Sequence, residues 1–178
     1  MAIHRIEDVL PEADWRPIFF GGLLNLNGRT SWFLTDERES RIAEITQRAK
    51  GYGLPPITWP TELPASLLNL GRAATVAKRE GKLVPFSLAA SEDYWARGRD
   101  PSTDESLRRL AGEAGMDGDA LLDAIRQQDV KDELKRTTEE AHARGVPGVP
   151  TVVVGDLVFW GDDRLEEAAA AAASGAAA

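Results

Sequence analysis

The chain has 178 residues, of which 43% are hydrophobic and 28% charged, and its formal net charge is -8. This composition is ordinary for one soluble globular domain with a substantial core. The acidic excess argues against nucleic acids and anionic membranes as main partners, because both favour clustered lysine and arginine. The chain contains no cysteine, which excludes a disulfide, a thiolate metal site or a Cys-x-x-Cys redox pair within it.

The same totals bear on location and on metals. No run of about 18 apolar residues predicts a transmembrane helix. The acidic start MAIHRIED differs from the apolar segment of a signal peptide, so we expect a cytoplasmic protein. Two histidines, His4 and His142, are too few for a multi-histidine site, and no metal site is expected.

The N-terminal part of the chain predicts one helix and one strand. Residues 4–10 read as the end of a helix, because their apolar positions recur at helical spacing before a proline. Residues 14–20 (DWRPIFF) predict a strand, and Pro17 places it at a sheet edge because proline cannot donate to a ladder. We expect a loop over residues 23–36.

The middle of the chain is predicted to be helical. Apolar stripes, capping residues and glycine stops indicate helices near 42–52, 66–80, 83–96, 102–115, 117–125 and 129–145. Ser102 and Glu105 have the spacing of a capping box at the start of one of them. A proline-rich loop from Pro55 to Pro64 surrounds Trp59.

The C-terminal part predicts a hairpin and a last helix. The β-branched run 151–154 indicates a buried strand, and 157–160 indicates its return strand after a Gly-Asp turn. Asp162 or Asp163 can cap the helix that follows and ends in an alanine-rich tail. The whole pattern predicts one α/β domain with a helical insertion.

Two features near this hairpin predict a binding site. Two prolines and two glycines before the strand favour a cis bond at Val149–Pro150. Such a turn leaves the main-chain groups of Val149 free to hold an extended, peptide-like ligand. At the next helix start, free N–H groups attract a carboxylate, while Asp162 or Asp163 can pair with an ammonium group. Simple helix capping is the alternative for both aspartates.

Three segments carry a resemblance to a known family: WRPIFFGGLL, RAATVAKREGKLVPFSLAASEDYWARGRD and RGVPGVPTVVVGDLVFWGDDRLEE. The chain resembles the thioredoxin-like family of DsbA and the 2-hydroxychromene-2-carboxylate isomerases, which includes the kappa-class glutathione transferases. The resemblance implies a thioredoxin-like α/β fold with an all-helical insertion. It places residues 1–38 and 145–178 in the thioredoxin-like domain and 39–144 in the insertion.

The resemblance also implies a cofactor and partners. Glutathione, or another low-molecular-weight thiol, is the expected cofactor, and a small aromatic carboxylate is the expected substrate. By position, the Val149 backbone holds the cysteinyl part and Pro150 is the cis-proline. Asp162 with Asp163 binds the γ-glutamyl end. A homodimer is also expected, whereas nucleic acid and membrane are not.

Five further residues are candidates beside this cofactor site. Asn25 and Asn27 are candidates for a secondary glutathione contact, and turn formation is the alternative for both. Trp59, Tyr94 and Trp95 are candidates for lining a pocket that holds an aromatic substrate. Packing under the proline loop or in the core is the alternative for these three.

One part of the family pattern is absent. In the isomerases and kappa transferases a serine near the first helix start hydrogen-bonds the thiolate, and in the oxidoreductases a cysteine takes its place. This chain has no S-P-[WY] segment, and Ser31 and Ser40 are poor substitutes because capping or loop positions explain them. We therefore assign no catalytic residue, and expect the first strand to be missing from an N-terminally truncated chain.

Three hypotheses follow from these observations. The first is a glutathione-dependent isomerase or transferase resembling 2-hydroxychromene-2-carboxylate isomerase. The second is a non-catalytic thioredoxin-like binding or dimerisation module. The third, a DsbA-like oxidoreductase, requires a cysteine upstream of this chain.

Overall fold

The computed structural model spans the chain and describes residues 1–61 and 66–175. The N-terminal part contains short helices and one long one: η1 (Ala2–His4), α1 (Ile6–Val9), α2 (Phe20–Leu26), η2 (Trp32–Leu34) and α3 (Arg38–Gly51). The middle is helical, with α4 (Leu67–Arg79), α5 (Leu83–Trp95), α6 (Asp104–Glu113), α7 (Gly118–Ala124) and α8 (Gln128–Ala143). The chain continues with β1 (Thr151–Val154), β2 (Leu157–Trp160), η3 (Asp162–Arg164) and α9 (Leu165–Ala173).

The middle helices confirm the prediction, because capping residues and apolar stripes act locally. Ser66 caps α4 by accepting a hydrogen bond from the Asn69 amide, and Asp117 caps α7. The predicted capping box on Ser102 is wrong. Thr103 caps α6 instead, because the Ser102 hydroxyl is held by Asp100 and by the Ser66 amide. Pro64 of the predicted proline loop lies outside the described residues.

The predicted edge strand over 14–20 is wrong. Two of its backbone groups bond to threonines of α8 instead of to a neighbouring strand. The Phe19 amide donates to Thr138 Oγ1 at 2.9 Å, and Thr137 Oγ1 donates to the Pro17 carbonyl at 2.9 Å. Helix α2 starts at Phe20, so the two glycines expected to end a strand lie inside a helix. The predicted loop over 23–36 is therefore partly helical, in α2 and η2.

The predicted hairpin is confirmed, with β1 and β2 antiparallel and Thr151 opposite Trp160. The Val149–Pro150 peptide bond is cis, as the sequence indicated. The expectation that β1 is a buried strand is wrong, because Val154 is its one buried residue. The physical reason is that β1 pairs with β2 alone among the described residues, so its other edge has no neighbouring strand.

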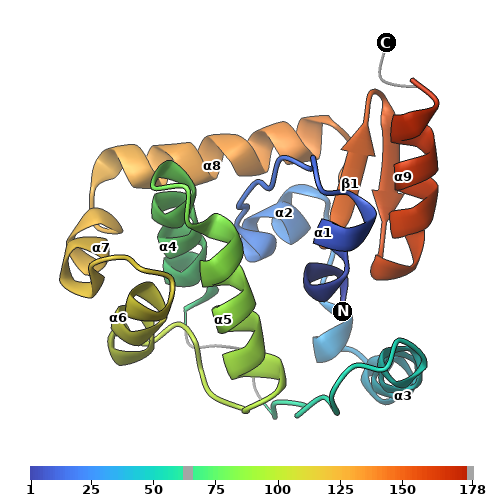
Figure 1. Ribbon diagram of the computed structural model, residues 1–178, viewed down its shortest axis with the longest axis horizontal. Coiled ribbons are helices and arrows are strands. Elements are labelled where there is room, and N and C mark those ends of the chain that lie inside the picture. Colours follow the sequence, from blue (N-terminus) through green and yellow to red (C-terminus); the bar gives the residue numbers. More distant parts are fainter. Residues whose placement is uncertain (62–65, 176–178) are drawn as a thin grey trace.

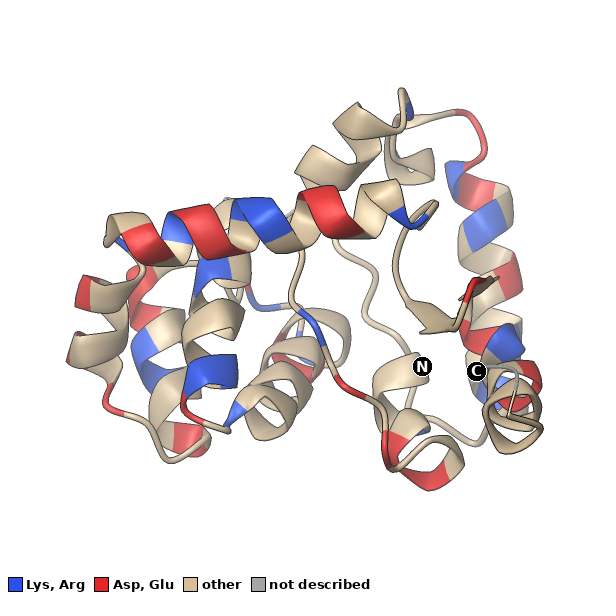
Figure 2. Ribbon diagram, turned by 90° about the horizontal axis from the view of Figure 1, so that it is seen from above, with Lys and Arg blue, Asp and Glu red and all other residues tan. Residues whose placement is uncertain are grey.

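The elements form two groups joined by one long helix (Figure 1). Helices α4 to α7 lie together on one side, and the hairpin with α9 lies on the other, while α8 runs between them. The α4–α8 side holds the larger buried apolar cluster, and a smaller one lies between the hairpin and α9. Acidic and basic residues alternate in bands along α8 (Figure 2), which is typical of a solvated helix face.

Two expectations concern the chain as a whole. The division into residues 1–38 with 145–178 and an inserted 39–144 stays a prediction. Within the described ranges, 1–61 and 66–175, none of the helices combines the length and apolar character that crossing a membrane requires.

Candidate functional site

A cavity of about 930 Å³ lies between the α4–α5 side of the fold and the start of the hairpin. Its volume lies at the upper end of the range for ligand pockets, roughly 300–1,000 Å³. The structure brings together most of the residues predicted for a site. Those that line the cavity are Val149, Pro150, Asp162, Trp59, Tyr94 and Trp95.

One wall of the cavity is aromatic. Trp59 and Trp95 meet edge to face with centroids 5.6 Å apart, and Tyr94 packs on Trp95 at 4.6 Å. Trp32 extends the row, 6.3 Å from Trp59. Such a wall can take a flat ring by stacking or by edge-to-face contact. The sequence missed Trp32, because nothing in the expected loop around it indicated that it faces the same space.

Burial raises the pKa of Tyr94 to about 12, and the negative charge of Asp100 acts in the same direction. The Tyr94 hydroxyl is therefore protonated throughout the physiological range. The neighbouring Trp59 indole donates to Thr46 Oγ1 at 2.9 Å, which ties this ring to helix α3. This hydrogen bond thus fixes the Trp59 ring of the aromatic wall.

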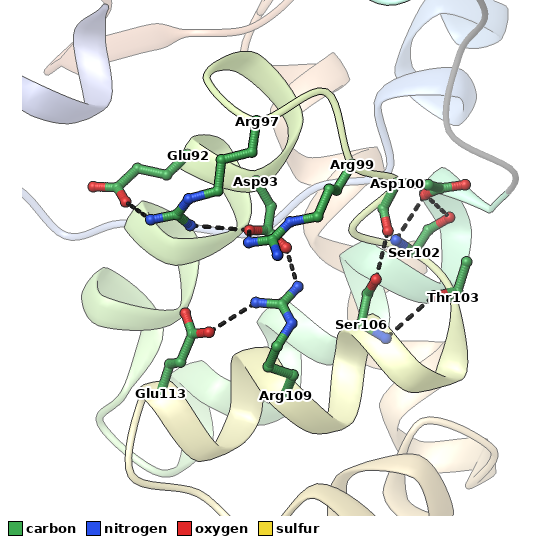
Figure 3. A network of polar contacts seen from close by, with 10 residues as sticks. All are labelled: Glu92, Asp93, Arg97, Arg99, Asp100, Ser102, Thr103, Ser106, Arg109 and Glu113. Carbon is green, nitrogen blue, oxygen red and sulfur yellow. Dashed lines mark hydrogen bonds and ion pairs between the residues drawn. The ribbon is translucent and has the colours of Figure 1, made fainter. Parts of the chain in front are cut away.

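A buried carboxylate anchors the end of α5 that carries this wall (Figure 3). Asp93 has no exposed surface, and it accepts hydrogen bonds from Arg97, Arg99 and Arg109. Burial by itself raises the pKa of Asp93, but the hydrogen bonds from the three arginines outweigh it and hold the pKa below its usual value. The network fixes the position of the next two residues along the chain, Tyr94 and Trp95.

The polar end of the cavity is formed by Asp162, which is 7% exposed. Its Oδ1 accepts from Arg48 Nη1 at 3.0 Å, and its carbonyl accepts from Arg5 Nη1 at 2.8 Å. Its other oxygen, Oδ2, is buried and has no hydrogen-bond partner among the described residues. The capping alternative for Asp162 is wrong, because its side chain makes no cap hydrogen bond and turns toward Arg48. A buried carboxylate oxygen without a donor is an acceptor for a cationic or N–H group of a ligand.

Arg48 is the residue that sequence reasoning missed at this end. Its Nη1 also lies 3.3 Å from Asp163 Oδ1, so one guanidinium pairs with both predicted aspartates. Burial lowers the pKa of Arg48, but the charges of Asp162 and Asp163 outweigh this effect and leave the pKa raised. Asp163 is exposed and does not line the cavity. Only the long-range packing of α3 against η3 brings Arg48 here, and no local pattern signals it.

Val149 is the main-chain element of the site. The residue is 46% exposed, and neither its amide nor its carbonyl bonds to another backbone group in the described part of the chain. The next carbonyl, that of Pro150, is already used by the Gly161 amide at 3.0 Å. A free N–H and C=O beside a cavity can pair with an extended, peptide-like ligand as a neighbouring strand would.

The two predicted asparagines lie elsewhere. Asn27 ends α2, donates to the Val146 carbonyl at 2.9 Å, and lies 2.9 Å from the His142 ring nitrogen Nδ1. Asn25 lines a separate, smaller cavity. Neither residue lines the larger cavity. The sequence placed both in a loop, whereas helix α2 turns them toward α8.

Other groups in the cavity are few. His4, Ser87, Ser91 and Glu92 are the further polar lining residues, among those described, that sequence reasoning missed. Ser31 caps η2 and Ser40 donates to the Glu37 carbonyl, so neither faces the cavity. In the part of the chain that the structure describes, no three histidine, aspartate or glutamate side chains are grouped to hold a metal ion.

This fold and this sequence define a class of protein. The profile of the DSBA-like thioredoxin domain matches residues 5–173, so the chain belongs to that family. The thioredoxin-like fold expected from the sequence is confirmed. The solved structure of a 2-hydroxychromene-2-carboxylate isomerase has the same fold, with a TM-score of 0.78 at 19% identity, over 97% of this chain and 85% of that one.

Two curated relatives are similar in sequence to parts of this chain. The 2-hydroxychromene-2-carboxylate isomerase of Sphingobium xenophagum is 34% identical over 125 residues, which are 70% of this chain and 63% of that protein. The isomerase of the same name from Pseudomonas sp. (strain C18) is 39% identical over 112 residues, 62% of this chain and 51% of that protein. The matches thus span less than two thirds of these relatives.

Proposed function

We propose that this chain forms the binding part of a glutathione-dependent isomerase or transferase that acts on a small aromatic carboxylate. One observation carries the proposal. The larger cavity brings together the main-chain groups of Val149, the buried carboxylate of Asp162 and the aromatic wall formed by Trp59 and Trp95. A tripeptide thiol and a flat aromatic acid are the pair of ligands that such a combination suits.

The fit to glutathione is supported by two groups that lack partners. The free amide and carbonyl of Val149 can pair with the cysteinyl backbone, and the unpartnered Asp162 Oδ2 can accept from the γ-glutamyl ammonium group. When bound, glutathione supplies a thiolate that adds reversibly to a conjugated substrate.

The residues of this chain have binding and orienting roles in this proposal. Arg48 holds the Asp162 carboxylate so that its second oxygen faces the ligand. Trp59 and Trp95 contact the substrate ring and exclude water from it. Because the pKa of Tyr94 is raised, its hydroxyl stays protonated and uncharged. We assign no thiolate partner among these residues.

Calorimetric titration of the full chain with glutathione tests the proposal. We expect saturable binding, weakened roughly tenfold or more in Asp162→Asn, because a charge-assisted hydrogen bond contributes about 1.5–3 kcal/mol. Asp163→Asn is the matched control and should bind nearly as wild type, since Asp163 does not line the cavity. No binding of glutathione by the wild-type chain contradicts the proposal.

A second measurement separates the enzyme from a binding module. Isomerisation of 2-hydroxychromene-2-carboxylate is followed by absorbance, with and without glutathione. Turnover that requires glutathione supports the isomerase reading. Binding of glutathione without turnover of this substrate or of a transferase substrate favours the non-catalytic module.

A further inference from the structure

A second cavity, of about 300 Å³, opens between α2, α4 and α8. It shares no lining residue with the larger cavity. Helix α4 separates the two: Leu68 and Arg72 line the smaller cavity, whereas Leu67, Leu70 and Gly71 line the larger one. The smaller cavity is therefore a separate site, and nothing in the proposed function uses it.

Two cations in this cavity have no carboxylate partner among the described residues, unlike most arginines of this acidic chain. Arg72 donates to the Asn69 side chain at 3.3 Å, and its Nε is buried without a hydrogen-bond partner among the described residues. Lys131 is half-buried, and its ammonium group makes no ion pair or hydrogen bond within residues 1–61 and 66–175. A partly buried cation without a partner is unfavourable unless an anion or water completes it.

The remaining charges of the cavity do not compensate these two. Its one carboxylate, Glu139, lies 3.8 Å from the Lys135 ammonium group, which is itself at the rim. That pair is mutually neutralised, so Arg72 and Lys131 leave the cavity positive in a chain whose net charge is -8. The side-chain amide of Asn25 adds a neutral donor to the same lining.

Apart from Thr138, whose hydroxyl bonds to the Leu134 carbonyl and the Phe19 amide, the rest of the lining is apolar. Phe19 and Leu26 lie on one side, Leu68 comes from α4, and the fully buried Leu134 comes from α8. A cavity of this size that is lined by both cationic and apolar side chains is complementary to a small ligand with one anionic head and an apolar body.

We propose that the smaller cavity binds a small aromatic monocarboxylate. The carboxylate lies between Arg72 and Lys131, where it completes the Arg72 Nε donor, and the ring packs against Phe19 and Leu134. Such a ligand belongs to the same chemical class as the substrate proposed for the larger cavity. Helix α4 forms a wall of both cavities.

Benzoate is the probe, titrated into the uniformly ¹⁵N-labelled full chain and followed by amide shifts. We expect saturable shifts centred on the amides around Arg72 of α4 and Lys131 of α8. R72M and K131M each remove one cation while keeping an apolar chain, and each should weaken benzoate binding roughly tenfold. K50M is the matched control, because Lys50 is exposed on α3 and lines neither cavity.

Three results of the benzoate titrations overturn the proposal. They are the absence of saturable binding, unchanged affinity in both R72M and K131M, and shifts confined to the aromatic wall of the larger cavity. Benzyl alcohol, which lacks the charge, should bind at least tenfold more weakly than benzoate, and equal affinity would also contradict a carboxylate site. If R72M does not fold, K131M decides alone, because the Lys131 ammonium group makes no ion pair or hydrogen bond among the described residues that its loss would break. This test is independent of glutathione, so it can fail or succeed without affecting the proposed function.

Discussion

The helical side and the hairpin side of this molecule bury their apolar residues to different depths. On the helical side, α4 to α8 enclose a cluster in which Phe86, Leu107 and Leu110 are at most 1% exposed. On the hairpin side, the cluster consists of Val154, Phe159 and Ala168, and Val154 and Phe159 both keep 8% of their surface exposed. The difference follows from enclosure: helices pack on several faces of that core, whereas α9 covers one face of a hairpin with a free edge.

This comparison separates stability from binding. The helical side has the packing that dominates folding free energy. The hairpin side supplies the exposed main chain of Val149 and the partly satisfied carboxylate of Asp162, which are groups that a fully packed core would not leave free. The larger cavity lies between the two, so it combines an aromatic wall from the stable side with polar groups from the open side.

The largest change in the free energy of unfolding is expected when the same substitution is made on each of the two sides. Phe86→Ala should lower the free energy of unfolding by about 3–5 kcal/mol, because it leaves a void in a closely packed cluster. Phe159→Ala should cost less, at or below about 3 kcal/mol, because its surroundings are open and can relax. Urea unfolding with a common slope measures both. Equal losses would show that the two sides are packed alike.

The next effect concerns the carboxylate in Figure 3. Asp93→Asn keeps the shape but removes the charge that three arginines share, and should cost about 2 kcal/mol. Glu92→Gln is the control, since the Glu92 side chain is 46% exposed and pairs with Arg97; it should change stability by less than about 1 kcal/mol. A loss of stability in Glu92→Gln as large as that in Asp93→Asn would show that the burial of the Asp93 carboxylate has no special role.

The pH dependence of the same variant follows from the lowered pKa of Asp93. A carboxyl whose folded pKa lies below its unfolded value, about 3.9, stabilises the protein above that pH. This contribution is lost as the pH falls through the folded pKa. The stability difference between wild type and Asp93→Asn should therefore be full at pH 7 and shrink below about pH 4. A difference that stays constant down to pH 2 would contradict this origin.

A smaller effect is expected at the turn that presents Asp162. Gly161 has φ +118°, and a Cβ there would lie 2.4 Å from Asp163 Oδ1. Gly161→Ala should cost about 1–2 kcal/mol, because alanine is strained at this φ. Gly112→Ala is the control inside α6, where a Cβ meets nothing within 4 Å; it should stabilise by about 0.5–1 kcal/mol. Opposite signs in thermal unfolding would confirm that the two glycines have different roles.

The smallest effect measures the link between α3 and the hairpin side. A double-mutant cycle of Arg48→Gln and Asp162→Asn should give a coupling of about 1 kcal/mol, as is typical of residues in direct contact. The same cycle with Asp163→Asn should give less, because Asp163 is farther from Arg48 and more exposed. Zero coupling to Asp162 would mean that α3 does not depend on this ion pair for its position.

The elements that the sequence determined by itself are those whose signals are local. The hairpin, the cis proline and the helices from α4 to α8 follow from local spacing, turn and capping residues and β-branched runs. The aromatic wall was also predicted from its residue types, although Trp32 was missed. Backbone and side-chain preferences over a few residues suffice for such features.

Only the tertiary structure decided the features in which distant segments of the chain meet. The segment 14–19 is not a strand because the threonines of α8 satisfy its backbone. Arg48 reaches Asp162 because the fold brings α3 close to η3, and Arg72 and Lys131 line one cavity because α4 packs against α8. Each of these contacts depends on the relative placement of helices far apart in sequence, which is decided by the burial of shared apolar faces and leaves no local pattern in the chain.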